Sequence, residues 1–132
     1  LSRTAGFDTG TFVYPNYVDA TGIIYEHEVG YAYDSDTEVF AESGPIQLGN
    51  GDRMMVAKSL IPDEKTQGNV TATFKTRFFP NGTESSFGPF DMANPTSVRF
   101  QGRQVQMRIT GNTAASWRVG TMRLDVVEGG RR

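Results

Sequence analysis

The fold is decided by residues 98–127, whose sequence is VRFQGRQVQMRITGNTAASWRVGTMRLDVV. Apolar and polar side chains alternate on both sides of a polar stretch at residues 110–113, and Gly102 interrupts the first alternating run. A period of two residues is typical of a strand with one buried face, and an isolated glycine within it indicates a bulge. The stretch therefore predicts a β-hairpin. Its expected inward positions are Val98, Phe100, Val105, Met107, Ile109, Trp117, Val119, Met122, Leu124 and Val126.

The composition favours an all-β chain. Its 132 residues include fifteen glycines, nine phenylalanines and five tyrosines, and no cysteine. Aromatic and β-branched residues are enriched in strands, and no segment shows the 3.6-residue period of an amphipathic helix. A chain of this length buries a real core without disulfides. The sequence therefore predicts an antiparallel β-sandwich, jelly-roll or immunoglobulin-like, with an irregular N-terminal segment.

Two regions are expected along the chain. Residues 1–22, which contain several glycines and a proline, predict an N-terminal connecting segment. Residues 23–132 are expected to form the sandwich, and their first strand is predicted at residues 23–29. Because the sequence begins without methionine, we expect a fragment or a processed product of a longer protein.

Further strands are predicted between the first strand and the hairpin. Residues 54–61 are almost continuously apolar, which indicates a strand covered on both faces. Residues 69–79 alternate clearly, with Ala72 and Phe74 on the inward side. Residues 83–97 are polar and predict a loop, with a short edge strand near residues 87–92.

The charge excludes two classes of partner for the chain as a whole. Thirteen lysines and arginines stand against fifteen aspartates and glutamates, which gives a formal net charge of −2. A nearly neutral chain is not expected to attract nucleic acid or anionic membranes by its overall field. No apolar run approaches the ~20 residues of a membrane-spanning helix, so no membrane span is expected.

Arginines are concentrated in the predicted hairpin and at the end of the chain. If several of them share one sheet face, they form a positive stripe that contacts phosphates or an acidic neighbour. The alternative is a solvated face on which the arginines pair with Asp and Glu across strands. Two aromatic residues of the loop at residues 83–97 complete the predicted interface. The candidate interface residues are Arg99, Arg103, Arg108, Arg118, Arg123, Arg131, Arg132, Phe87 and Phe90.

Few residues suggest catalysis or metal binding. The acidic residues 34–38 offer oxygens to a calcium ion, but they lack the glycine and distal glutamate of an EF-hand, and a solvated turn is the favoured interpretation. Glu26 and Glu28 share a strand face and are the best available carboxylate pair for a glycosidase. His27 is the only histidine, so a multi-histidine site is excluded. We expect no catalytic residue, no metal and no cofactor.

Several short motifs are distinctive as a set: IYEHEVG (24–30), ESGP (42–45), GNGD (49–52), LIPD (60–63), GRQ (102–104), WRVG (117–120), RLDV (123–126) and GGRR (129–132). With these motifs the chain resembles tailed-bacteriophage virion structural proteins of the tail-nozzle or packaged-DNA-stabilisation type. The similarity is to the C-terminal part of such proteins and covers residues 23–132. These proteins are several times longer than this chain, and their propeller portion has no counterpart in it.

The resemblance implies a non-enzymatic virion component, made in the bacterial host cytoplasm and placed in the phage tail. Its implied partners are copies of itself in a ring, expected to be a hexamer, and neighbouring tail or adaptor proteins, with packaged DNA as a further contact. The alternative is a carbohydrate- or receptor-binding module of a phage tail fibre, with a glycan ligand. Its candidate aromatics are Tyr31, Tyr33, Phe87 and Phe90. A third class, an envelope-degrading hydrolase, requires the pair Glu26 and Glu28.

Overall fold

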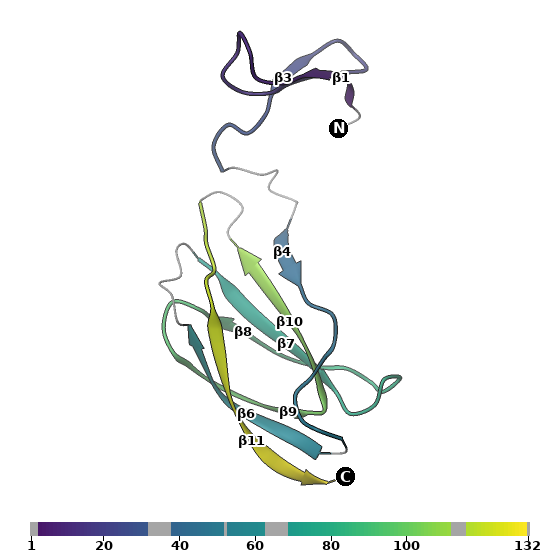
Figure 1. Ribbon diagram of the computed structural model, residues 1–132, viewed down its shortest axis with the longest axis vertical. Helices are drawn as coiled ribbons and strands as arrows, with labels where there is room; N and C mark the ends of the chain where they lie inside the picture. The colour runs from purple at the N-terminus through teal and green to yellow at the C-terminus, as the bar shows by residue number, and fades with distance from the viewer. Residues whose placement is uncertain (1–2, 32–37, 52, 63–68, 112–115, 132) are drawn as a thin grey trace. The chain divides into compact units, whose positions relative to one another are not determined.

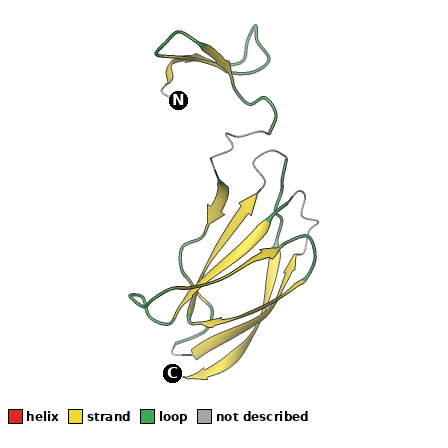
Figure 2. Cartoon of the chain, turned by 180° about the vertical axis from the view of Figure 1, so that it is seen from behind, coloured by secondary structure: helices red, strands yellow, loops and turns green. Residues whose placement is uncertain are grey.

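The computed structural model describes residues 3–31, 38–51, 53–62, 69–111 and 116–131, and every regular element among them is a β-strand. The chain divides into two compact units, Leu1–Ala32 and Tyr33–Arg132 (Figure 1). Strands and loops alone make up both units over the described residues (Figure 2). The prediction of an all-β chain is confirmed.

The N-terminal unit contains a three-stranded antiparallel sheet in the order β1-β2-β3. Its strands are β1 (Arg3–Phe7), β2 (Asn16–Asp19) and β3 (Ile24–Glu26). Asp19 fixes the turn between β2 and β3, because its Oδ1 accepts hydrogen bonds from the backbone nitrogens of Thr21 and Ile23 at 2.8 and 3.0 Å. The Thr21 hydroxyl donates to the same oxygen and is the main cause of a lowered pKa of Asp19.

The structure differs from the sequence prediction in this region. Residues 1–22, for which the sequence predicts an irregular segment, contain β1 and β2. The strand predicted to open the sandwich pairs with β2 as β3, so the second unit begins at Tyr33 and not at residue 23. The physical reason is that all five residues of β1 are exposed and none alternates with a buried neighbour. A strand without a buried face leaves no period in the sequence.

The second unit is a sandwich of two antiparallel sheets. The larger sheet has the order β4-β10-β7-β8, with β5 also paired to β10, and the smaller sheet has the order β11-β6-β9. The strands are β4 (Val39–Glu42), β5 (Ile46–Gln47), β6 (Arg53–Pro62), β7 (Thr71–Arg77), β8 (Ser85–Asp91), β9 (Thr96–Gly102), β10 (Gln104–Gly111) and β11 (Met122–Arg131). The predicted antiparallel sandwich is confirmed.

Both sheets contribute to one core. Phe74 of β7 is 2% exposed and stacks on Phe100 of β9, with ring centroids 4.7 Å apart. Ala72 and Val98 are also fully buried, so the alternations predicted for these two strands are confirmed. The buried cluster consists of Ala57, Leu60, Val70, Ala72, Phe74, Met92, Val98, Phe100 and Val105.

The hairpin predicted for residues 98–127 is wrong. β9 lies in the smaller sheet and β10 in the larger one, so the chain passes from one sheet to the other at Arg103. Gly102 is buried at this corner, where a Cβ atom would lie only 2.9 Å from the Cβ of Thr76. The predicted bulge glycine is therefore the point at which the strand changes sheet.

The last strand also has an unexpected partner. β11 pairs with β6, with Leu124 opposite Leu60, and not with β10. In an immunoglobulin domain the first strand pairs with the second and the last with the strand before it. Here β4 pairs with β10 and β11 with β6, so the first and last strands have exchanged sheets. The alternation of apolar residues defines the buried face of a strand but not its partner.

β6 is the central strand of the smaller sheet. Ala57 and Leu60 belong to the core and Met54 is also buried, whereas Lys58 and Ile61 are exposed. The prediction of cover on both faces is therefore wrong for this strand. Residues 83–97 also differ from the predicted loop, because they contain all of β8 and the first residues of β9. The predicted edge strand is present and is longer than expected.

Candidate functional site

The arginines predicted to form one interface lie on different surfaces. Arg99 on β9 and Arg123 on β11 are exposed on the outer side of the smaller sheet, because their chain neighbours point into the core. Arg108 on β10 lies on the outer side of the larger sheet, where its ion pairs are found. The positive stripe is therefore divided between two sheets. Arg118 is exposed before β11, Arg131 is the last residue of β11, and Arg132 lies outside the described residues.

Glu42 on β4 is the centre of a charged network on the larger sheet. Its carboxylate accepts hydrogen bonds from Lys75 at 3.0 Å, from Gln106 at 2.8 Å and from Arg108 at 3.1 Å. The hydrogen bonds from Lys75 and then Arg108 hold the pKa of Glu42 below its ordinary value. Arg108 also pairs with Glu38. This network is the alternative that the sequence offered, arginines paired with acidic residues across strands.

Removal of the Glu42 carboxylate is expected to lower the free energy of unfolding less at acidic pH than at neutral pH. Because the folded-state pKa is lowered, the carboxylate stabilises the native state above the pKa of the unfolded chain, about 4.3, and this contribution is lost as pH falls through the folded-state pKa. We therefore expect Glu42→Gln to lower the free energy of unfolding at neutral pH, with a difference from the wild type that shrinks below about pH 4.3. Urea unfolding across this range measures it.

The matched control is Glu84→Gln, at the residue that precedes β8 of the same sheet. Glu84 makes one longer contact, 3.9 Å to Arg77, and its side chain is half exposed. Its replacement is expected to change stability little at any pH, as for most surface pairs. Equal pH profiles for the two variants would contradict the role assigned to Glu42.

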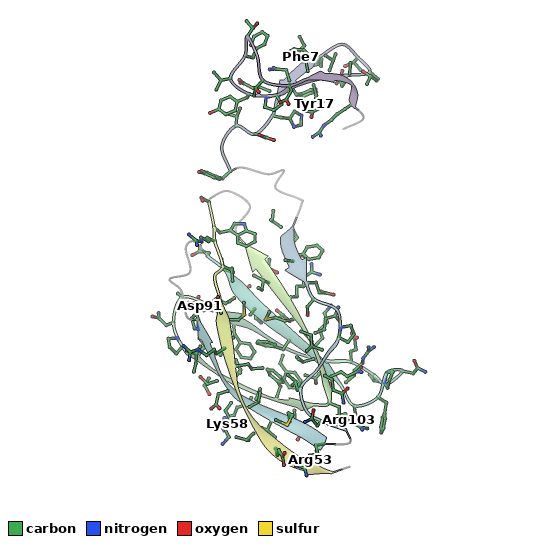
Figure 3. All side chains as sticks on the ribbon, in the orientation of Figure 1. Phe7, Tyr17, Arg53, Lys58, Asp91 and Arg103 are labelled. Carbon is green, nitrogen blue, oxygen red and sulfur yellow. The ribbon has the colours of Figure 1, made fainter. Side chains whose placement is uncertain are left out.

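Arg103 has a structural position at the corner between β9 and β10. Its backbone nitrogen donates to the Arg77 carbonyl at 3.2 Å, and its carbonyl accepts from the Leu48 nitrogen at 3.0 Å. Its guanidinium donates to the Gly51 carbonyl at 3.4 Å and lies 5.6 Å from the centre of the Phe79 ring. Figure 3 labels the side chain at this corner of the sandwich. Its contacts therefore connect the segment from Leu48 to Gly51 with the segment from Arg77 to Phe79.

Phe87 and Phe90 are not exposed aromatic platforms. Both lie on β8, are half-buried and pack against the core. Phe87 lies 5.9 Å from the Phe100 ring, and Phe90 lies 6.1 Å from the Phe74 ring. Of the other aromatics proposed for glycan binding, Tyr31 is 65% exposed, and Tyr33 lies outside the described residues.

A groove that the sequence did not indicate lies along β9, an edge strand of the smaller sheet. Its volume is about 580 Å³. Lys58 of β6 and Arg99 of β9 contribute its two cationic side chains, and Lys58 points away from the sandwich (Figure 3). The lining residues are Val56, Ala57, Lys58, Phe87, Ser97, Arg99, Phe100 and Gln101. Sequence reasoning missed Lys58 because a single lysine in an apolar strand does not show which basic residue lies beside it.

The two sides of the N-terminal sheet differ. On one side Tyr17 and His27 make an edge-to-face contact, with ring centroids 4.6 Å apart. The Cζ atom of Arg3 lies over the Tyr17 ring, 4.8 Å from its centroid. Gly6 allows this arrangement, because a Cβ atom there would lie 2.4 Å from the Tyr17 ring. We call the opposite side the open face, where strand register places Ala5, Phe7, Asn16, Val18, Ile24 and Glu26.

The apolar side chains of the open face are partly or largely exposed. Phe7 is 46% exposed and Ile24 is 62% exposed. Phe12 contacts Phe7, with ring centroids 5.9 Å apart, and is itself exposed. Phe7 and Tyr17 lie on opposite sides of the sheet (Figure 3). This surface could not be predicted from the sequence, because β1 and β2 come from the segment predicted to be irregular.

The carboxylates considered from the sequence for catalysis or metal binding do not form a common site among the described residues. Glu26 and Glu28 are exposed and line none of the grooves found there. No group of three or more His, Asp or Glu side chains within the described ranges is placed to hold a metal ion. The acidic residues 34–37 lie outside those ranges, and Glu38 pairs with Arg108. In the same part of the chain, no helix has the length and apolar character needed to cross a membrane.

The chain was compared with protein-family models, with curated proteins and with solved structures, and none of the three comparisons finds a match.

Proposed function

We propose that this chain is a non-enzymatic structural component of a bacteriophage tail, a nozzle-like ring protein that assembles with copies of itself around the DNA channel. The motifs that resemble phage tail proteins support the tail assignment. The exposed apolar side of the N-terminal sheet, the open face, supports assembly and is the observation that carries the proposal.

The N-terminal sheet buries almost no apolar surface within itself. Burial of apolar surface contributes about 25 cal/mol per Å² and is the dominant favourable term in folding. Among residues 3–31, however, only Asn16 is buried. Units below about 40 residues usually need a disulfide, a metal or a partner, and this chain has no cysteine. The open face therefore needs a second protein surface to cover it.

A ring provides that surface from the neighbouring subunit. In a head-to-tail contact each subunit presents one patch to its neighbour and receives another, and the ring closes when the rotation allows it. The sandwich, with its continuous core, is the rigid body of each subunit. The charged groups around the contact define register more than affinity.

The proposal predicts that a charge placed on the open face prevents association. Burying Phe7 or Ile24 contributes about 1.5–3 kcal/mol each, so Phe7→Asp and Ile24→Asp are each expected to weaken self-association by about tenfold or more. Sedimentation velocity over a range of protein concentrations measures the change, and negative-stain images show whether the wild-type chain forms rings.

Val13→Asp is the matched control. Val13 is 78% exposed in the loop between β1 and β2, outside the open face, so its replacement adds the same charge without touching the contact. We expect it to associate like the wild type. A wild-type chain that sediments as a monomer at every concentration would refute self-assembly through this face.

A further inference from the structure

The groove on the smaller sheet contains two cations without a partner among the described residues. Lys58 and Arg99 are both exposed, and neither forms an ion pair with a described acidic side chain. In the charged network of the larger sheet, by contrast, Lys75 and Arg108 share Glu42. The two groove cations are therefore available to an acidic group from outside.

The rest of the groove is mainly apolar. Val56, Phe87 and Phe100 contribute to its lining, with Ser97 and Gln101 as neutral polar neighbours. Two positive charges beside apolar surface suit a ligand that carries both carboxylates and apolar side chains. They do not suit a polyanion, which needs many cations along its length and would meet a chain of net charge −2.

The groove follows a free sheet edge. β9 pairs with β6 on one side and with no described strand on the other. The other edges are interrupted: β8 contains Pro89, residues 43–45 separate β4 from β5, and the pairing of β11 with β6 shifts register twice. β9 has seven residues and no proline. Half of the backbone groups of an edge strand point outward and can pair with an added strand.

We infer that β9 is a docking edge for an extended acidic peptide segment, which adds to the smaller sheet as a fourth strand. The peptide backbone pairs with β9, and alternate side chains of the peptide lie over the groove. Acidic side chains on the groove side of the peptide lie beside Arg99 of β9, the strand with which the peptide pairs. Lys58 of β6, the next strand of the sheet, is the second cation in the same groove. This site is independent of the open face of the N-terminal sheet.

The test uses the full chain and two labelled peptides of about eight residues, one alternating valine with glutamate and the other valine with lysine. Fluorescence anisotropy is expected to show binding of the glutamate peptide only. In the double variant Lys58→Glu and Arg99→Glu we expect the preference to reverse, with about tenfold or greater loss for the glutamate peptide and gain of the lysine peptide. Unfolding cannot produce such a reversal.

Two controls separate strand addition from ionic attraction. Glutamate peptides methylated on alternate backbone nitrogens are prepared in both registers, and the one that blocks the paired edge is expected to lose binding. Ser86→Glu on β8 adds a negative charge outside the groove lining and is expected to leave binding unchanged. Equal binding of both methylated peptides, no reversal in the double variant, or binding of a DNA oligonucleotide in preference to the glutamate peptide would overturn the inference.

Discussion

Replacement of Phe74 by alanine is expected to lower the free energy of unfolding by about 3–5 kcal/mol, the largest effect of any single side-chain truncation considered for this chain. Phe74 is 2% exposed and belongs to the central part of the larger sheet. Its ring stacks on Phe100 of the opposite sheet, so the substitution removes contacts from both layers at once. The whole free energy of unfolding of a domain of this size is about 5–15 kcal/mol, so the variant loses a large share of its stability.

Guanidinium unfolding followed by the fluorescence of Trp117, the only tryptophan, measures this loss. Trp117 is half-buried and packs against the core, so it reports on the integrity of the sandwich. Phe79→Ala is the matched control, because Phe79 is 58% exposed. We expect it to cost less than about 1 kcal/mol, as surface substitutions usually do. Similar losses for the two variants would contradict the assignment of Phe74 to the core.

Replacement of Gly88 by alanine is expected to destabilise the sandwich by about 2–4 kcal/mol through two separate causes. Gly88 has a φ of +118°, which residues with a side chain rarely adopt. A Cβ atom there would also lie 2.9 Å from the carbonyl oxygen of Ala72, a backbone atom of the paired strand β7. The substitution therefore forces β8 away from its partner, together with the core contacts of Phe87 and Phe90.

Gly44→Ala tests whether the effect belongs to this position. Gly44 lies between β4 and β5, has no positive φ, and a Cβ atom there meets nothing within 4 Å. We expect a change within about 0.5 kcal/mol of the wild type. Thermal unfolding of both variants provides the comparison. A loss at Gly44 as large as that at Gly88 would show that any glycine replacement disturbs the sheets.

Alternation in the sequence identified the buried faces correctly. Ala72 and Phe74 on β7, and Val98 and Phe100 on β9, all lie in the core as predicted. The same pattern could not identify the partners of the strands. Each strand presents an equivalent apolar face, and the pairing of Leu124 with Leu60 depends on how all strands pack together.

The sequence also could not show which basic residues lie side by side. Arg99 and Arg108 are close in the sequence but lie on different sheets, because the chain changes sheet between them. The groove instead joins Arg99 to Lys58, which comes from a distant part of the sequence. The open face escaped prediction for a different reason, since a strand with both sides exposed has no apolar period.

The exchange of the first and last strands between sheets has a consequence for biosynthesis. β6 is made early, but one of its two neighbours, β11, is the last strand of the sandwich to leave the ribosome. Until then, one edge of a long apolar strand has no partner within the chain. Pairing between distant segments is slow, and unpaired apolar edges are prone to aggregate. Cellular yield should therefore depend on how quickly β11 docks and on chaperones that shield β6 in the meantime.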